Sequence, residues 1–148
     1  MEKNVINFYL ITDKYGCFSN FSRHHIFLME KIWKTSEHYF QAQKFAGTEF
    51  EEKVRLAPTP KESANLGRNR KFPLRRDWEE VKDDIMREAL RAKFTQHKDL
   101  RNILLETGDA LLVEHTANDS YWADGGDGSG KNMLGKLLMK LREELIKE

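Results

Sequence analysis

The chain has 148 residues, of which 39% are hydrophobic and 33% are charged, with only 3 Pro and 9 Gly. This composition is typical of one compact globular domain, and it argues against a disordered chain or a tandem array. No apolar run approaches the roughly 20 residues that a membrane span needs, and the charged first residues lack the apolar core of a secretory signal. We therefore expect a cytoplasmic protein with no membrane partner.

Charge and cysteine content narrow the range of functions further. The 25 basic and 24 acidic residues give a net charge of +1, which argues against a large nonspecific nucleic-acid surface. The single cysteine, Cys17, cannot form an internal disulfide. The five histidines show neither the i, i+4 pairing nor the carboxylate spacing of a zinc site. We predict no metal and no cofactor.

The first third of the chain favours short strands followed by short helices. Residues 7–10 and 25–29 are brief apolar segments with aromatic and branched side chains, and they predict a small antiparallel ribbon. Three helix starts follow, each preceded by a hydroxyl side chain. They predict helices from Thr35 or Ser36 to Phe45 with Gly47 as the stop, from Thr48 onward, and from Thr59-Pro60 to Gly67.

The rest of the chain is expected to be mostly helical. Asp77 can cap a long, central buried helix, and a short helix is expected over about 99–106, followed by a strand over 110–113. A last helix begins near Asn132. The apolar stripes of the two long helices are Trp78, Val81, Ile85, Met86, Ala89, Leu90 and Phe94 in the first, and Leu134, Leu137, Leu138, Leu141 and Leu145 in the second. The fold class is therefore mainly α (α+β): one compact multihelical domain over 1–148 with a small antiparallel β element.

The first predicted helix carries chemistry on one face. At 3.6 residues per turn, Glu37, Gln41 and Lys44 fall on the same side. Glu37 and Lys44 lie two turns apart, about 10 Å along the axis, which is too far for a direct pair unless both side chains lean inward, but suits the two ends of one ligand. The alternative is an ordinary solvated polar face.

A glycine-rich turn, Gly125 to Asn132, precedes the last predicted helix. Backbone N–H groups at a helix start approached through glycines favour an anion such as phosphate. The spacing approaches that of a P-loop, but the preceding segment is polar and Asn132 lacks the hydroxyl that binds Mg²⁺, so we reject a nucleotidase. The alternative is a simple turn.

A basic run between Gly67 and Arg76 holds five cations in ten residues. Arginine forks suit phosphate oxygens, so the run predicts either a phosphate contact or a solvated surface. A small nucleic-acid-binding domain built on this run is a further alternative, which the nearly neutral net charge disfavours.

A set of motifs spread over nearly the full length resembles the NADAR (YbiA-like) family. In chain order they are Phe18-Ser19-Asn20-Phe21, the segment Trp33–Phe45 with Thr-x-Glu-His-Tyr-Phe-Gln-Ala-Gln-Lys-Phe, Leu66-Gly67-Arg68, Asp77-Trp78, Lys93-Phe94, Asp119–Trp122 and Gly130–Gly135. The resemblance implies a mostly helical N-glycosidase that cleaves the bond between an amino group and C1 of a phosphorylated ribose. Known family substrates are ribosylamino-pyrimidine intermediates of riboflavin synthesis and guanine whose exocyclic amine carries ADP-ribose.

The resemblance also assigns roles to residues. Glu37 and Asp119 are the expected catalytic carboxylates, which should meet around C1, because positive charge develops there as the bond breaks. Lys44 is expected either to bind a phosphate or hydroxyl, or to attack C1 as a Schiff-base amine. The remaining substrate-binding residues are expected to be Ser19, Asn20, Gln41, Arg68, Trp78, Trp122, Gly128 and Asn132.

The sequence departs from the family pattern at one position, and it leaves one alternative function open. Family members commonly have Trp-Gly where this chain has Trp122-Ala123, so Ala123 must adopt a different backbone if that glycine needs a positive φ. The alternative function is a non-catalytic module that binds ADP-ribose or a nucleotide. In either case the expected partner is a ribose-phosphate or ADP-ribose compound, including ADP-ribosylated nucleic acid.

Overall fold

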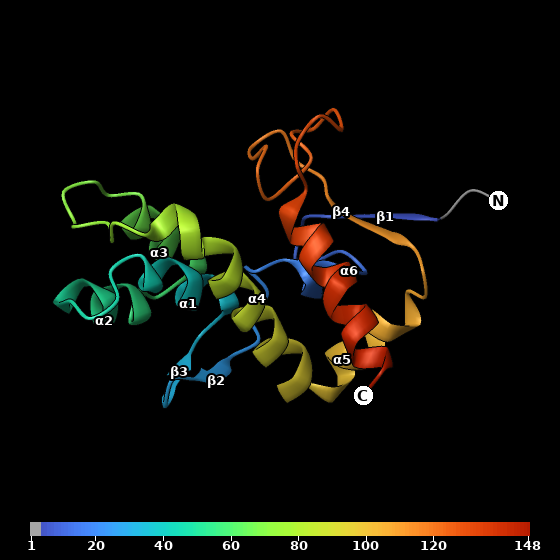
Figure 1. Ribbon diagram of the computed structural model, residues 1–148, viewed down its shortest axis with the longest axis horizontal. Helices are drawn as coiled ribbons and strands as arrows, with labels where there is room; N and C mark the ends of the chain where they lie inside the picture. Colours follow the sequence, from blue (N-terminus) through green and yellow to red (C-terminus); the bar gives the residue numbers. More distant parts are fainter. Residues whose placement is uncertain (1–3) are drawn as a thin grey trace. The chain divides into compact units, whose positions relative to one another are not determined.

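In the computed structural model, residues 4–148 are described and contain six α-helices and four short strands (Figure 1). The expectation that the charged first residues do not form a secretory signal concerns residues 1–3 in part, and these lie outside the described residues. The mainly helical class with minor β structure is confirmed. The chain divides into two compact units, one made of the amino-terminal residues through Ser19 together with His97–Glu148, the other of Asn20–Gln96. No helix in residues 4–148 is both long enough and apolar enough to cross a lipid bilayer.

The second unit, Asn20–Gln96, contains most of the helices. They are α1 (Ser36–Gln43), α2 (Glu49–Arg55), α3 (Pro60–Gly67) and α4 (Trp78–Gln96), with the strands β2 (Ile26–Leu28) and β3 (Lys31–Trp33). Helix α1 packs against α2, α3 and α4, and so lies at the centre of the unit (Figure 1).

The predicted hydroxyl caps are confirmed. Thr35 accepts a hydrogen bond from the His38 N–H, Thr48 from that of Phe50 and Thr59 from that of Glu62. Helix α1 ends at Gln43 rather than Phe45, because the next two N–H groups bond to carbonyls only three residues back.

The long helix α4 begins where it was predicted. The Asp77 carbonyl accepts from the N–H groups of Glu80 and Val81, but the Asp77 carboxylate binds Arg75 Nε at 2.6 Å instead of capping the helix. The predicted apolar stripe is buried at Trp78, Ile85, Met86, Ala89, Leu90 and Phe94, whereas Val81 is half-buried.

The predicted strand pairing is only partly correct. An antiparallel ribbon exists, but β2 pairs with β3, and β1 (Val5–Phe8) pairs in parallel with β4 (Leu111–Glu114) of its own unit. The turn between β2 and β3 places Met29 and Glu30 at positive φ, which a type I′ turn requires but which only Gly, Asn and Asp signal in a sequence. The parallel pair joins segments about a hundred residues apart, beyond the reach of local patterning.

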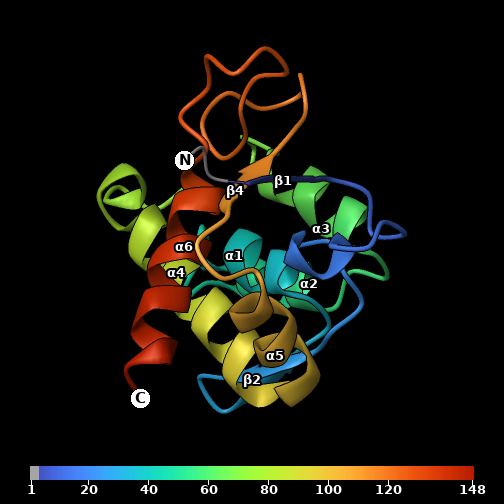
Figure 2. The same cartoon turned by 90° about the vertical axis from the view of Figure 1, so that its right-hand side faces the viewer.

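The first unit adds the helices α5 (Lys98–Glu106) and α6 (Met133–Ile146) and a short 3₁₀ turn at Gly16–Phe18. Figure 2 shows α6 running past the β1–β4 pair. The predicted apolar face of α6 is buried at Leu134, Leu138, Leu141 and Leu145, and half-buried at Leu137. A Cβ on Gly135 would lie 2.0 Å from the Leu112 carbonyl oxygen, so α6 approaches β4 backbone to backbone.

We predict that Gly135→Ala destabilises the protein by about 1–3 kcal/mol, because the added methyl overpacks against the backbone carbonyl of Leu112 in β4. This effect has the opposite sign to helix propensity, which favours Ala over Gly by about 1 kcal/mol. Urea unfolding measures it, with the exposed neighbour Lys136→Ala as the control, expected within about 0.5 kcal/mol of wild type. A Gly135→Ala variant as stable as wild type would refute the close approach.

Candidate active site

The polar face of α1 is buried. Glu37 is 8% exposed, Gln41 5% and Lys44 7%. The alternative of an ordinary solvated face is therefore wrong for these side chains. Burying an acid, an amide and an amine on one helix is unfavourable unless they are hydrogen-bonded or serve a ligand.

Asn20 fixes the start of α1. Its side-chain oxygen accepts from Ser36 Oγ at 2.7 Å, its amide nitrogen lies 3.3 Å from Met86 Sδ on α4, and its carbonyl accepts from the Glu37 N–H. Asn20, which was predicted to contact substrate, thus has both ends of its side-chain amide in contact with other residues of the protein. Its observed effect is to place Glu37.

A second anchor holds the same end of the helix. The His38 ring is fully buried, with Nδ1 at 2.8 Å from Thr35 Oγ1 and Nε2 at 2.9 Å from the Ala57 carbonyl oxygen. Burial lowers the pKa of His38, so the neutral ring donates from Nε2 to the carbonyl. His38 ties α1 to the segment between α2 and α3 and is not directed at a ligand.

Glu37 and Gln41 form a pair one turn apart. Gln41 Nε2 donates to Glu37 Oε2 at 2.8 Å, which orients the carboxylate. The other end of the amide lies against α3, where a Cβ on Gly67 would come within 2.0 Å of Gln41 Oε1. Because Gly67, the last residue of α3, has no side chain, the Gln41 amide fits at this position.

Lys44 lies at the far end of the face, in an apolar and cationic setting. Its Nζ is 3.4 Å from the Gly67 carbonyl oxygen and 5.9 Å and 5.8 Å from the ring centroids of Phe40 and Trp78. Burial, reinforced by the positive charge of Arg70, lowers the pKa of Lys44 to about 8, and the opposing effect of Glu37 does not restore it. A substantial fraction of neutral amine is therefore present near neutral pH.

Trp78 forms a wall beside this amine. Its ring centroid is 5.0 Å from that of Phe40, and the indole is 5% exposed. The structure therefore brings together four of the predicted site residues, Glu37, Gln41, Lys44 and Trp78, on α1 and the start of α4.

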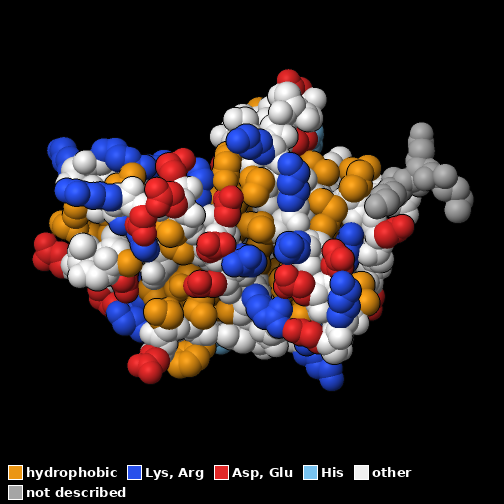
Figure 3. All heavy atoms as spheres, in the orientation of Figure 1, with side chains coloured by type: hydrophobic (Ala, Val, Ile, Leu, Met, Phe, Trp, Pro, Cys, Tyr) orange, Lys and Arg blue, Asp and Glu red, His pale blue; other side chains and the backbone are white. Residues whose placement is uncertain are grey.

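The basic run follows α3 and is tied to the end of α1. The Arg75 N–H donates to the Lys44 carbonyl at 3.0 Å, and Arg70 donates to the Gly67 carbonyl at 2.9 Å. Figure 3 shows Lys and Arg side chains gathered over this loop. Arg75 is paired with Asp77, so not every cation of the run is equally able to bind a phosphate. Arg68 is exposed, and it is close enough to Lys44 to lower the pKa of that amine.

The remaining predicted residues belong to the first unit. Asp119 Oδ1 accepts from the N–H groups of Tyr121 and Trp122, both at 2.8 Å, and thereby shapes the turn. Trp122 is half-buried and packs edge-on against Tyr121, with the ring centroids 4.9 Å apart. Ser19 is buried, and its N–H donates to the Gly16 carbonyl.

The glycine turn is organised around Asp124, which sequence reasoning misses. Its carboxylate accepts from the N–H groups of Gly126 and Thr116 and bonds to His115 Nδ1 at 2.7 Å, which lowers the Asp124 pKa. Its carbonyl accepts from Gly128 and Gly130. Only the Asp-Gly dipeptide, an ordinary turn signal, marks this acid in the sequence.

Backbone N–H groups at the start of α6 are also used internally. Those of Asn132, Met133 and Leu134 donate to carbonyls of residues 121–123. The Asn132 side chain bonds the Glu114 N–H and the Leu112 carbonyl of β4. Gly128 is exposed with a positive φ. Any anion received here would have to be held by side chains rather than by these amides.

Ala123 needs no special backbone. It is fully buried, and its φ is not among the positive values in residues 4–148. The turn after Trp122 therefore forms without a glycine at that position.

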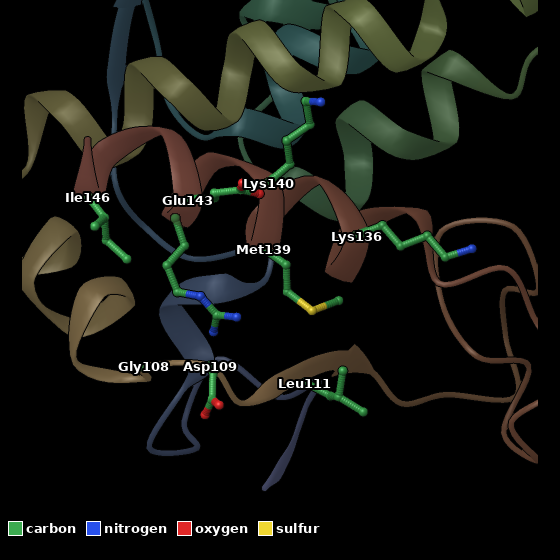
Figure 4. Close-up of a pocket in the computed structure, with 9 residues that line it drawn as sticks. Gly108, Asp109, Leu111, Lys136, Met139, Lys140, Glu143 and Ile146 are labelled. Carbon is green, nitrogen blue, oxygen red and sulfur yellow. The ribbon is translucent and has the colours of Figure 1, made fainter. Parts of the chain in front are cut away.

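A cavity of about 510 Å³ lies in the first unit beside α6, and it contains none of the predicted site residues (Figure 4). Met139 points from α6 toward the segment of Leu111. Both acidic and basic side chains line it, so the lining favours neither an anion nor a cation. The lining residues are Gly108, Asp109, Leu111, Lys136, Met139, Lys140, Arg142, Glu143 and Ile146.

Comparison with known proteins assigns the class. The model of the NADAR domain matches residues 7–146, nearly the whole chain. The chain therefore belongs to the NADAR family.

Individual relatives are consistent with that assignment. N-glycosidase YbiA of Escherichia coli is 55% identical over 148 residues, covering 100% of this chain and 92% of that protein. N-glycosidase Npun_R5314 of Nostoc punctiforme is 51% identical, covering 95% of this chain and 92% of that protein. The solution NMR structure of E. coli YbiA matches with a TM-score of 0.92 and 55% identity, covering 99% of this chain and 88% of that one.

We predict that the Lys44 amine titrates near pH 8 rather than at the roughly 10.4 of an exposed lysine. Reductive ¹³C-methylation followed by NMR pH titration measures this, and loss of the signal in Lys44→Gln assigns it. Arg70→Gln removes a like charge and should move the midpoint upward. A wild-type midpoint above pH 10 would contradict the environment described.

Proposed function

We propose that this N-glycosidase of the NADAR family hydrolyses the bond between an amino group and C1 of a phosphorylated ribose. The observation that carries the proposal is the buried face of α1, where an oriented carboxylate and an amine of lowered pKa stand on one helix beside Trp78. An acid and an amine placed in this way suit a reaction that develops positive charge at a sugar carbon.

Two substrate classes are proposed. Riboflavin biosynthesis proteins support the first, the ribosylamino-pyrimidine intermediates: PYRR of Zea mays is 41% identical over 98% of this chain, although this chain covers only 26% of that protein. VVA0006 of Vibrio vulnificus is 41% identical over 95% of this chain, and this chain covers 38% of that protein. The second class, guanine carrying ADP-ribose on its exocyclic amine, rests on the resemblance of the motifs to the family.

In the proposed reaction the C1–N bond breaks with its electron pair going to the amine. The oxygen of water forms the new bond to C1, and the proton that this water loses replaces the one delivered to the amine. Glu37 stabilises the cationic sugar through its carboxylate, which Gln41 orients. An acid must also deliver a proton to the departing amine. We assign that role to Asp119, on the resemblance alone.

Lys44 has two candidate roles. As a cation it would bind a phosphate or a hydroxyl. As a neutral amine it would attack C1 of the ring-opened sugar, expel the amine and form an imine that water then hydrolyses. The lowered pKa supports the second role, because about a quarter of an amine with a pKa near 8 is neutral at pH 7.5.

The substrate phosphate is proposed to contact the basic segment after α3. Arg68 is exposed there and acts electrostatically on Lys44, and a guanidinium suits phosphate oxygens. The other predicted binding residues, Ser19, Asn20, Trp122, Gly128 and Asn132, are retained as proposals on the resemblance.

We expect Glu37→Gln to lower kcat at least a hundredfold on ADP-ribosylated guanine or on a ribosylamino-pyrimidine, because a neutral amide cannot stabilise the cationic sugar. Chromatography of the released base measures turnover. Glu62→Gln, an exposed carboxylate of α3, is the control and should retain full activity. Asp119→Asn is assayed in the same way, and its kcat should also be lower than that of wild type.

Equal rates for wild type and Glu37→Gln would refute the role of Glu37. Tight binding of ADP-ribose with every substrate left intact would favour the non-catalytic module instead.

We expect borohydride to trap a sugar phosphate covalently on Lys44 during turnover, and Lys44→Arg to lose both the adduct and activity, since a guanidinium keeps the charge but is no nucleophile. Peptide mass spectrometry locates the adduct, and Lys53→Arg is the control. Retained kcat in Lys44→Arg with a raised KM would show that Lys44 only binds.

A further inference from the structure

We infer that Gln41 is a positioning residue that holds the Glu37 carboxylate in its ionised form and fixes its plane. This inference rests on the proposed function, because it assumes that Glu37 acts on the sugar. It differs from the expectation that Gln41 contacts substrate.

The nitrogen end of the amide makes the contact that matters. Gln41 Nε2 donates to Glu37 Oε2 at 2.8 Å, across one turn of α1, and both side chains are more than nine-tenths buried. A hydrogen bond to the charged form of a carboxylate favours that form over the protonated acid. It also removes rotational freedom from the side chain.

The oxygen end shows that this contact has a cost in stability. Gln41 Oε1 is the one buried side-chain nitrogen or oxygen in residues 4–148 that has no hydrogen-bond partner. A buried acceptor without a partner is destabilising. Turning the amide over would not help, because it would set the oxygen against the Glu37 carboxylate. An apolar side chain would remove the orphaned oxygen, but it would also remove the donor that the buried Glu37 carboxylate uses. What a glutamine provides here is therefore its contact with Glu37.

Gly67 supplies an independent observation. A Cβ at this position would lie 2.0 Å from Gln41 Oε1 and 2.8 Å from the side-chain carbonyl carbon. Gly67 ends α3 without a positive φ, so its backbone does not require glycine, and glycine is a poor helix former. The missing side chain is explained by the space that the Gln41 amide occupies.

Together these features describe a local arrangement that sacrifices stability for the orientation of one carboxylate. Buried polar groups with unsatisfied atoms are found where function requires them. The position of Gln41 therefore predicts that its replacement separates stability from activity, which a purely structural residue would not do.

The test compares Gln41→Met with Gln43→Met, the same substitution at a buried glutamine two residues along the same helix. We expect Gln41→Met to unfold at about the same urea concentration as wild type, because removal of the orphaned oxygen offsets the lost hydrogen bond to Glu37, with kcat lowered at least tenfold and KM changed less than threefold. The acid limb of its pH–rate profile should move up by about one pH unit, the size of a lost charge-assisted hydrogen bond. Gln43→Met should keep kcat within twofold and leave the profile unchanged.

Two further readouts separate this inference from the proposed function. ¹³C NMR of the Glu37 carboxyl should show its protonation midpoint moving upward in Gln41→Met, whether or not the enzyme turns over. In the Glu37→Gln background, Gln41→Met should cause no additional loss of rate. Gly67→Ala, which displaces the amide from the other side, should resemble Gln41→Met in its pH profile.

An unchanged Glu37 midpoint together with an unchanged pH–rate profile in Gln41→Met would overturn the inference. So would a loss of kcat that is matched by a comparable loss of stability, because that result indicates a structural role. Full activity of Glu37→Gln would instead overturn the catalytic role of Glu37 on which the inference depends, and the inference would fall with it.

Discussion

Helix α1 is buried on its polar side as well as its apolar side, and the second unit is organised around this constraint. The hydrogen bonds of Asn20 and His38 hold the first turn of α1 in place. Contacts within the protein therefore fix the position of Glu37. At the other end of the helix, the Lys44 carbonyl accepts a hydrogen bond from the N–H of Arg75 in the loop that follows α3. The neighbours of α1 thus fix a helix whose buried polar side chains would otherwise favour the surface.

The chemistry follows from the same burial. An amine that is removed from water and faces other cations loses its proton more readily, while the Glu37 carboxylate is oriented by the hydrogen bond that it accepts from the Gln41 amide. Placing both on one helix, two turns apart, lets a rigid element set the distance between them. The aromatic rings of Phe40 and Trp78 complete this environment, which we propose serves the reaction of an N-glycosidase.

Local signals predicted much of the fold and only part of the site. Hydroxyl caps, such as Thr59, and the apolar stripes are encoded within a few residues, so the helices could be predicted. The β1–β4 pairing depends on distant segments, and the β2–β3 turn uses Met29 at a positive φ, which no sequence rule favours. Helical spacing placed Glu37 and Lys44 on one face, but it could not show that α3 and the basic loop would bury that face.

The central claim is that the buried face of α1 receives the sugar. Titration with ribose 5-phosphate, followed by NMR of the Gln41 side-chain amide and the Lys44 Cε signals, tests it most directly. The account predicts saturable shifts of both signals at one common affinity. Saturable binding of ribose 5-phosphate that moves signals elsewhere in the protein and leaves these two unchanged would contradict it.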